Sequence, residues 1–206
     1  MITIIDYGLG NIGSVKNIIK NIGYKSIITS NPKEVEQASS IILPGVGSFD
    51  SGMEALESLD LVGILNEKAY SEKVPFLGIC LGAQLMTKRS REGQKDGLGW
   101  FDATTEEFNF QNQEGRWPLP NIGWRDVKPL SDESLLKGIE DPRFYFVHSY
   151  KLVPNENQDC SIMSSYGEHF CCGLNKDNLH CVQFHPEKSH IYGKKLLKNF
   201  LEIGNI

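Results

Sequence analysis

The 206-residue sequence predicts an α/β protein of one domain, residues 1–206, with an open, mostly parallel sheet flanked by helices and an antiparallel, strand-rich second half. Two observations support this prediction. Over the first half, short apolar runs alternate with amphipathic stretches, as in successive β-α-β units. Over the second half, strand-like runs follow one another with turns and few helical stretches between them.

The alternating half begins with a predicted strand at Ile2–Ile5 and a glycine-rich turn. An amphipathic helix is predicted from Ser14 to Ile22, because apolar residues recur at positions 15, 18, 19 and 22. The further elements of this half are strands at Lys25–Thr29 and Ser40–Leu43, a helical stretch from about Gly52 to Lys68, a strand from Val74 that runs into Cys80, and a helix from Leu81 to about Arg89.

The second half begins with a polar, glycine-containing loop over residues 91–99. Six strands are predicted after it, at Ala103–Phe108, Trp124–Val127, Phe144–Tyr150, Ser161–Ser165, Phe170–Leu174 and His180–Phe184. The turn Asn175–Asn178 joins the last two strands as a hairpin. A closing helix is predicted over His190–Leu201, and the absence of repeats and linkers in the sequence favours a single domain.

Composition limits the classes of function. The net charge is 21 − 26 = −5, which disfavours nucleic acid and acidic membranes as partners. No stretch approaches the length of a membrane span and the N-terminal apolar run is too short for a signal peptide. The five cysteines are odd in number and irregularly spaced, which disfavours a disulfide scaffold and is typical of the reducing cytoplasm.

The segment Gly78-Ile79-Cys80-Leu81-Gly82 has the pattern of a nucleophile elbow. A strand that runs into Gly-x-Cys-x-Gly and then into a helix makes a sharp turn, and the glycines remove side chains that would clash there. The amide groups at the start of the helix favour a thiolate. Taken alone, a cysteine in an apolar strand is more often a small buried hydrophobic residue.

A second strand ends at His185-Pro186-Glu187. A nucleophilic thiol needs a base, and the base needs an acid that fixes its tautomer. Cys80, His185 and Glu187 supply these three roles, and a separation of 105 residues between the cysteine and the histidine is no objection because such triads assemble in space. The combination predicts acyl transfer through a thioester.

The segment Pro44-Gly45-Val46-Gly47 follows a predicted strand and allows two interpretations. Formation of a thioester passes through an oxyanion, which backbone N–H groups stabilise. We therefore assign the amides of Val46 and Leu81 as the oxyanion-hole donors. The alternative is an ordinary turn at the end of a strand, which is what the loop alone would indicate.

Two further patterns are disfavoured as cofactor or metal sites. Gly8-Leu9-Gly10-Asn11-Ile12-Gly13 matches a dinucleotide fingerprint, but the acidic residue expected at the end of the second strand is missing, so a turn near a partner or ligand is the better interpretation. A metal is disfavoured because none of the candidate ligands has a metal-binding spacing; these are His169, Cys171, Cys172, His180, Cys181 and His190. We expect no cofactor and no metal.

The motifs together resemble those of the class I glutamine amidotransferases over essentially the whole chain. They stand in the family's order as Pro44-Gly45-Val46-Gly47, Gly78-Ile79-Cys80-Leu81-Gly82 with Gln84, and Gln183-Phe184-His185-Pro186-Glu187. The resemblance implies that Cys80 attacks the side-chain carbonyl of glutamine, that His185 transfers the proton, and that Glu187 orients His185. It also implies that glutamine is held by Gly47, Gln84, Ser149 and Tyr150.

Within the family, the chain is similar to the glutaminase subunits of imidazole glycerol phosphate synthases. This likeness rests on the segments Asp6–Asn11, Asn121–Trp124, Phe144–Tyr150 and Pro186–Ser189. It implies a heterodimer in which ammonia passes to a (β/α)8-barrel cyclase and activity depends on that partner. Asn11, Trp124, Tyr145 and Lys188 match the positions that face it.

One segment departs from the pattern of this group, which is usually His-Met-Gly-Trp-Asn, where this chain has Asn121-Ile122-Gly123-Trp124-Arg125. Asn121 and Arg125 therefore favour a second hypothesis, in which the chain supplies ammonia to a sugar amidotransferase of surface polysaccharide synthesis. A free-standing cysteine peptidase or deglycase would not need Gln84 or the strand with Ser149 and Tyr150, and a purely regulatory subunit would be expected to lose a triad residue.

Overall fold

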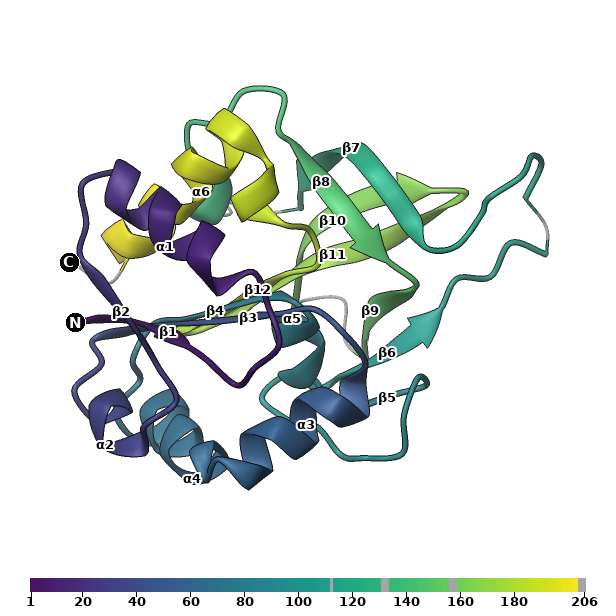
Figure 1. Ribbon diagram of the computed structural model, residues 1–206. Coiled ribbons are helices and arrows are strands. Elements are labelled where there is room, and N and C mark those ends of the chain that lie inside the picture. Colours follow the sequence, from purple (N-terminus) through teal and green to yellow (C-terminus); the bar gives the residue numbers. More distant parts are fainter. Residues whose placement is uncertain (112, 131–133, 156–158, 204–206) are drawn as a thin grey trace.

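The computed structural model describes residues 1–206 except 112, 131–133, 156–158 and 204–206. Its centre is a mixed sheet whose main path has the strand order β2-β1-β3-β4-β12-β11-β10-β7-β8. Helices cover both faces of the parallel part of this sheet, and the antiparallel strands extend from its other end (Figure 1). The predicted fold class is therefore confirmed.

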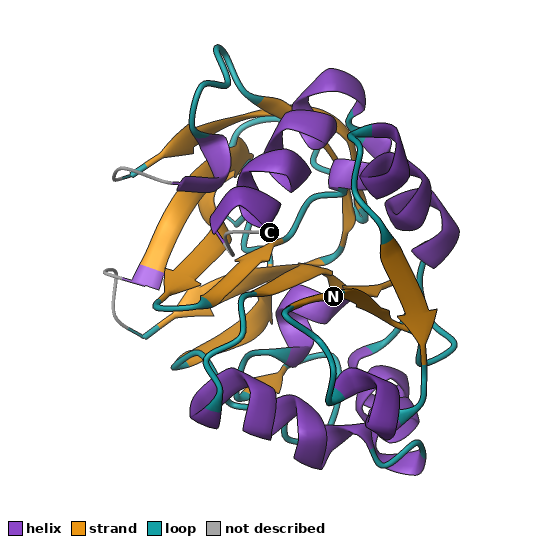
Figure 2. Cartoon of the chain, turned by 90° about the vertical axis from the view of Figure 1, so that its left-hand side faces the viewer, coloured by secondary structure: helices purple, strands orange, loops and turns teal. Residues whose placement is uncertain are grey.

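The parallel part consists of β1 (Ile2–Ile5), β2 (Ser26–Thr29), β3 (Ser40–Gly45), β4 (Phe76–Cys80) and β12 (Leu179–Val182). On one face lie α1 (Ile12–Asn21) and α6 (His190–Ile203), and on the other lie α2 (Pro32–Val35), α3 (Phe49–Ser58), α4 (Leu61–Asn66) and α5 (Leu81–Leu85) (Figures 1 and 2). This three-layer arrangement gives each face its own apolar core.

The antiparallel part consists of β11 (Glu168–Lys176), β10 (Cys160–Tyr166), β7 (Asn121–Pro129) and β8 (Arg143–His148). Three shorter strands lie off the main path: β5 (Arg89–Ser90), β6 (Ala103–Glu107) and β9 (Tyr150–Pro154). The predicted hairpin at Asn175–Asn178 is confirmed, because β11 and β12 pair antiparallel across it.

The position of β12 brings distant parts of the sequence together. Although it belongs to the strand-rich second half, β12 pairs in parallel with β4, with Val182 opposite Ile79. Since parallel strands end at the same edge of a sheet, the residues that follow β12 lie beside those that follow β4. This pairing places the His185 segment next to Cys80.

Three predicted elements differ from the structure. The helical stretch 52–68 begins earlier, at Phe49, and is divided where Asp60 takes a left-handed conformation with φ 54°, after which α4 runs into a π-helical turn at Glu67–Ser71. The helix predicted from Leu81 to Arg89 ends at Leu85, since the carbonyls of Leu85 and Met86 bond to amides of residues 98–101 instead. The strand predicted at Phe144–Tyr150 is divided at Ser149 into β8 and β9.

The features that were not predicted include a short helix and a disulfide. The short helix α2 begins after Asn31, whose side chain accepts a hydrogen bond from the Lys33 amide, and has Pro32 in its first turn. A disulfide joins Cys160 on β10 to Cys171 on β11, with their Cα atoms 6.0 Å apart. The expectation from cysteine number and spacing is therefore corrected for this one pair, which the folding of β10 onto β11 brings together.

Candidate active site

Cys80 lies at the sharp turn between β4 and α5. Its backbone has φ 53° and ψ −109°, a conformation that residues with a side chain rarely adopt. A Cβ atom on Gly82 would run into the Leu43 carbonyl oxygen, and one on Gly78 would lie 2.9 Å from the Ala83 Cα atom. The two glycines therefore allow the close approach of β4, α5 and β3 that presents Cys80 at the edge of the sheet.

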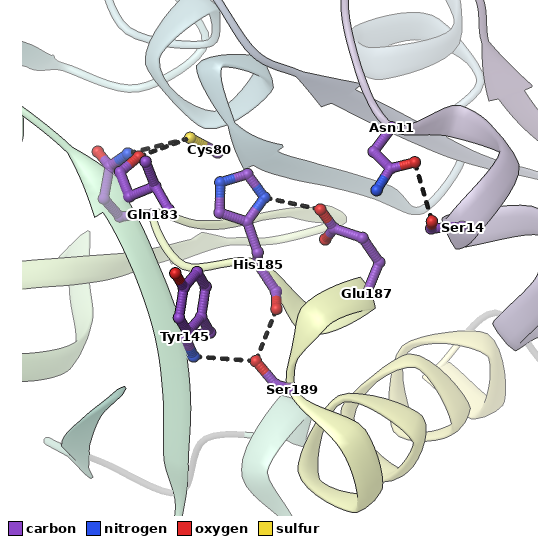
Figure 3. Close-up of polar contacts among 9 residues, drawn as sticks. Asn11, Ser14, Cys80, Tyr145, Gln183, His185, Glu187 and Ser189 are labelled. Carbon is purple, nitrogen blue, oxygen red and sulfur yellow. Dashed lines mark hydrogen bonds and ion pairs between the residues drawn. The ribbon is translucent and has the colours of Figure 1, made fainter. Parts of the chain in front are cut away.

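His185 lies between Cys80 and Glu187 (Figure 3). Its Nδ1 atom is 2.7 Å from Glu187 Oε1, and the side chains of the two residues are 2% and 3% exposed. The backbone around the imidazole is fixed as well: the His185 amide donates to the Tyr145 carbonyl (2.9 Å), and the Ser189 hydroxyl donates to the His185 carbonyl (2.6 Å). The position of the imidazole ring is thus fixed both by Glu187 and by the hydrogen bonds of the His185 main chain.

The charges around His185 favour its protonated form. Burial opposes protonation, but the Cys80 sulfur and the Glu187 carboxylate outweigh it and raise the pKa of His185 to about 10. At neutral pH His185 is therefore an imidazolium that lies between the Cys80 sulfur and the Glu187 carboxyl group. In this arrangement the Cys80 sulfur can act as a nucleophile, and the His185 imidazolium holds the proton that a leaving group needs.

A cavity of about 250 Å³ opens beside the sulfur. It is lined by every residue that the sequence motifs indicate for a glutamine site and an oxyanion hole, with two of the three triad residues: Val46, Gly47, Cys80, Leu81, Gln84, Ser149, Tyr150 and His185. Lys188 lies at the same cavity. The structure therefore brings together residues from β4, α5 and β9, from the junction of β8 and β9, and from the segments that follow β3 and β12.

The oxyanion-hole candidates lie at the two strand ends that flank the cavity. Gly45 is opposite Cys80 in the pairing of β3 with β4, and Val46 follows it with 42% of its surface exposed. Gly47 has a φ of 123°, which favours glycine. Leu81 is the first residue of α5, so its amide is among those at the start of this helix that lack a partner within it.

Sequence reasoning missed three polar residues near the sulfur. Glu92 lines the cavity, and its carboxylate accepts a hydrogen bond from the Phe49 amide at 2.9 Å. Gln183 is buried and its Nε2 atom lies 3.8 Å from Cys80 Sγ. Tyr7 is buried, and burial together with the charge of Cys80 raises the pKa of its hydroxyl.

Only one of these three carried a signal in the sequence. Gln183 lies two residues before His185 in the same motif, so its place there could have indicated it. Glu92 lies in a polar loop, and Tyr7 in the glycine-rich turn, where no spacing distinguishes a functional side chain from a solvated one.

Three of the four predicted partner-facing residues form one patch, which meets the cavity at Lys188. The rings of Trp124 and Tyr145 meet edge to face with centroids 6.2 Å apart, and Lys188 Nζ lies 6.0 Å from the Tyr145 ring centroid. Asn11 lies at the start of α1, on the other side of Glu187 from this patch, and its side chain accepts a hydrogen bond from Ser14 (Figure 3).

The N-terminal glycine-rich turn packs against the oxyanion-hole segment. A Cβ on Gly10 would lie 3.4 Å from the Gly45 Cα atom, so this turn supports the backbone beside the cavity. Among the residues that the structure describes, no group of three His, Cys, Asp or Glu side chains is placed to hold a metal ion. Within the same residues, no helix combines the length and the apolar character needed to cross a membrane.

Comparison with known proteins gives consistent results. Residues 3–203 match the family model "Glutamine amidotransferase class-I". The chain is 47% identical to imidazole glycerol phosphate synthase subunit HisH 2 of Methanococcus maripaludis, covering 98% of this chain and 99% of that one. It is 44% identical to subunit HisH 2 of Pseudomonas aeruginosa and 45% to subunit HisH of Bdellovibrio bacteriovorus, with 98% of this chain and 100% of each relative covered.

Solved structures share the fold at much lower identity. A structure described as a glutamine amidotransferase has a TM-score of 0.77 at 16% identity, with 99% of both chains covered. PurLQS from Thermotoga maritima has a TM-score of 0.75 at 15% identity, with 98% of this chain and 97% of that one covered. On the match over residues 3–203 and on these full-length relatives, the chain belongs to the class I glutamine amidotransferase family.

Proposed function

We propose that residues 1–206 form one glutaminase domain that hydrolyses glutamine to glutamate and ammonia and supplies the ammonia to a (β/α)8-barrel cyclase, which makes imidazole glycerol phosphate for histidine biosynthesis. The observation that carries the glutaminase activity is the position of His185 between Cys80 and Glu187 at the cavity. The choice of acceptor is supported by the full-length relatives, which are named subunits of imidazole glycerol phosphate synthase.

In the proposed reaction, the Cys80 thiolate attacks the side-chain carbonyl carbon of glutamine. The amides of Val46 and Leu81 stabilise the resulting oxyanion. As the C–N bond breaks, the His185 imidazolium gives its proton to the departing nitrogen, which leaves as ammonia. His185 then takes a proton from water, which hydrolyses the glutamyl thioester and restores the thiolate, while Glu187 holds the ring in place throughout.

The α-amino-acid end of glutamine would be held on the far side of the cavity from His185. Gly47, Gln84, Ser149 and Tyr150 line the cavity and would supply the polar groups of backbone and side chains that hold this end. Glu92 adds a carboxylate, which suits an α-ammonium group, because a partly dehydrated charge needs an opposite one. A site of this kind distinguishes a free amino acid from an amide within a peptide.

The barrel partner would bind over the patch of Trp124, Tyr145 and Lys188 and reach Asn11 across the cavity rim. The position of this patch beside the sulfur supports the proposal, because ammonia released there would pass directly into the interface. We further propose a cytoplasmic heterodimer in which the exposed Val46 segment takes its active conformation only when the partner binds. Near-maximal glutaminase activity in the isolated chain would contradict this dependence on a partner.

The decisive experiment measures glutamine hydrolysis by the chain together with its neighbouring barrel protein, with and without the phosphoribulosyl-formimino carboxamide nucleotide. Strong stimulation by the nucleotide is the expected result. Stimulation by the barrel but not by the nucleotide would refute the histidine-pathway acceptor and favour an amidated sugar, with Asn121 and Arg125 as the residues to exchange next. The Cys80→Ala variant should lose glutamine hydrolysis and keep the partner's activity with free ammonia; retained hydrolysis would refute the nucleophile.

A further inference from the structure

His148 is a buried histidine at the active-site cavity to which the proposed reaction assigns no role. It is the last residue of β8 and is 6% exposed, yet it contributes to the lining of the cavity. Aromatic rings surround it, with Phe108, Phe146 and Phe170 centroids 5.4, 5.5 and 5.4 Å from its own. A histidine that served only to fill this space would need no polar partners.

Both ring nitrogens of His148 have a partner. Nε2 lies 2.9 Å from the side-chain amide nitrogen (Nδ2) of Asn121, and Nδ1 lies 2.8 Å from the backbone carbonyl oxygen of Tyr150. Because an amide nitrogen can only donate, Nε2 accepts, and the single ring proton is on Nδ1 and points at the carbonyl. Asn121 thus selects the tautomer that can hold Tyr150.

The surroundings of His148 keep it uncharged. Burial lowers the pKa of His148 to about 4, although the hydrogen bond to Tyr150 acts in the opposite direction. The positive charges of His185 and Arg125 also lower it. At neutral pH the ring therefore has one proton to donate and one lone pair to accept, and both are used.

The Tyr150 carbonyl connects His148 to Gln84 and Gln183, the two glutamines near the Cys80 sulfur. The same oxygen lies 3.5 Å from Gln84 Nε2, which lies 3.2 Å from Gln183 Oε1. Gln183 Nε2 in turn lies 3.8 Å from Cys80 Sγ. His148 therefore anchors the backbone of the Ser149–Tyr150 segment at the point where this segment contacts Gln84.

We propose that His148, held in one tautomer by Asn121, is a positioning residue of the glutamine site: its Nδ1–H fixes the Tyr150 carbonyl and thereby sets Ser149, Tyr150 and Gln84 against the α-amino-acid end of the substrate. The inference rests on the proposed glutaminase function. It assigns Asn121, one of the residues at which this chain departs from its group, a role in the glutamine site.

The test compares two reagents that need different parts of the site in the complex of the chain with its barrel partner. Iodoacetamide needs only the Cys80 thiolate, whereas a diazoketone analogue of glutamine also needs the groups that hold the α-amino-acid end. In His148→Phe, which keeps a ring but cannot donate, the KM for glutamine should rise on the order of 10- to 100-fold. Inactivation by the analogue should slow by a similar factor, and alkylation by iodoacetamide should stay within about twofold.

His148→Gln is the matched variant, because its side-chain amide can still donate to a backbone carbonyl, and it should recover most of the affinity for glutamine. A KM in His148→Phe within about twofold of the wild type, or equal slowing with both reagents, would overturn the inference. Wild-type protein without any glutaminase activity would instead refute the proposed function, so the two failures are distinguishable.

Asn121→Asp provides a test that does not depend on the folding of His148→Phe. An ionised aspartate at position 121 can only accept a hydrogen bond. The neutral His148 ring would therefore carry its proton on Nε2, and Nδ1 would face the Tyr150 carbonyl without a proton to donate. Protonation of the ring at lower pH would restore the donor, so the KM of this variant should fall as the pH is lowered, in contrast to the wild type. A KM with the pH dependence of the wild type would overturn the role of Asn121.

Discussion

Replacing His180 by leucine is expected to reduce the sensitivity of the fold to acid. His180 lies on β12, is 2% exposed, and packs its ring against Phe200 of α6. Among the described residues, none forms a hydrogen bond with either of its ring nitrogens. Burial without a partner lowers the pKa of His180 to about 4, because a charged imidazolium there would have nothing to solvate it.

The sign and size of the effect follow from proton binding. In the unfolded chain the pKa of a histidine is about 6.5. Between about pH 6.5 and pH 4 the unfolded state therefore binds one proton more than the folded state at this site, and the free energy of unfolding falls as the pH falls. The loss reaches about 1.4 kcal/mol per pH unit and on the order of 3 kcal/mol over the window. Above this window the histidine has no such effect.

The assay is urea unfolding of the wild type and His180→Leu at several pH values between 8 and 4.5, values chosen to span about that window. The advantage of the variant should be constant above pH 7 and should grow by about 2 kcal/mol towards pH 4.5. His148 also titrates in this range but is present in both proteins, so its contribution cancels. His169→Leu, which changes an exposed histidine, serves as the control. A difference that does not change with pH would refute the reasoning.

Three further predictions concern the active site and its support. Glu187→Gln should lower the pKa of His185, so the alkaline limb of the pH profile of kcat/KM should move to lower pH. The maximum of kcat/KM should fall about a hundredfold or more. An alkaline limb at the wild-type pH would contradict the role of the carboxylate. Gly82→Ala should lower the free energy of unfolding by about 1–3 kcal/mol, since its Cβ would meet the Leu43 carbonyl, whereas Gly63→Ala, with open space around it, should be neutral or stabilising in the same denaturation experiment. Lys188→Ala should lower the affinity for the barrel partner or the amount of product formed there per glutamine hydrolysed, and two unchanged values would contradict the interface.

The meeting of Cys80, His185 and Glu187 at one place could be predicted because the proposed chemistry demands particular residues at particular spacings. Gly78 and Gly82 around Cys80, and Glu187 two residues after His185, are local patterns that report a turn and a hydrogen bond. The strands were predictable for a similar reason, since a buried strand such as β1 is apolar at every position except Thr3. Where the physical cause is local, the sequence contains it.

The features that were missed depend on contacts between distant segments. The end of α5 is set by residues 98–101, which take over its last carbonyls, and the disulfide of Cys160 and Cys171 is set by the pairing of β10 with β11. Glu92 reaches the cavity because its loop folds back onto the start of α3, where the Glu92 carboxylate accepts a hydrogen bond from the Phe49 amide. No periodicity or spacing in the sequence near these residues indicates which distant segment each of them contacts.

The pairing of β12 with β4 has a consequence for the growing chain. These strands are neighbours in the sheet, yet the whole of residues 81–178 lies between them in the sequence. A chain synthesised only as far as Asn178 contains Cys80 but neither His185 nor Glu187. Because synthesis proceeds from the N-terminus and contacts of long sequence separation form slowly, Cys80 remains without these two residues until β12 has joined the sheet. The fold thus delays the assembly of the proposed catalytic group until the strands that enclose it have been synthesised.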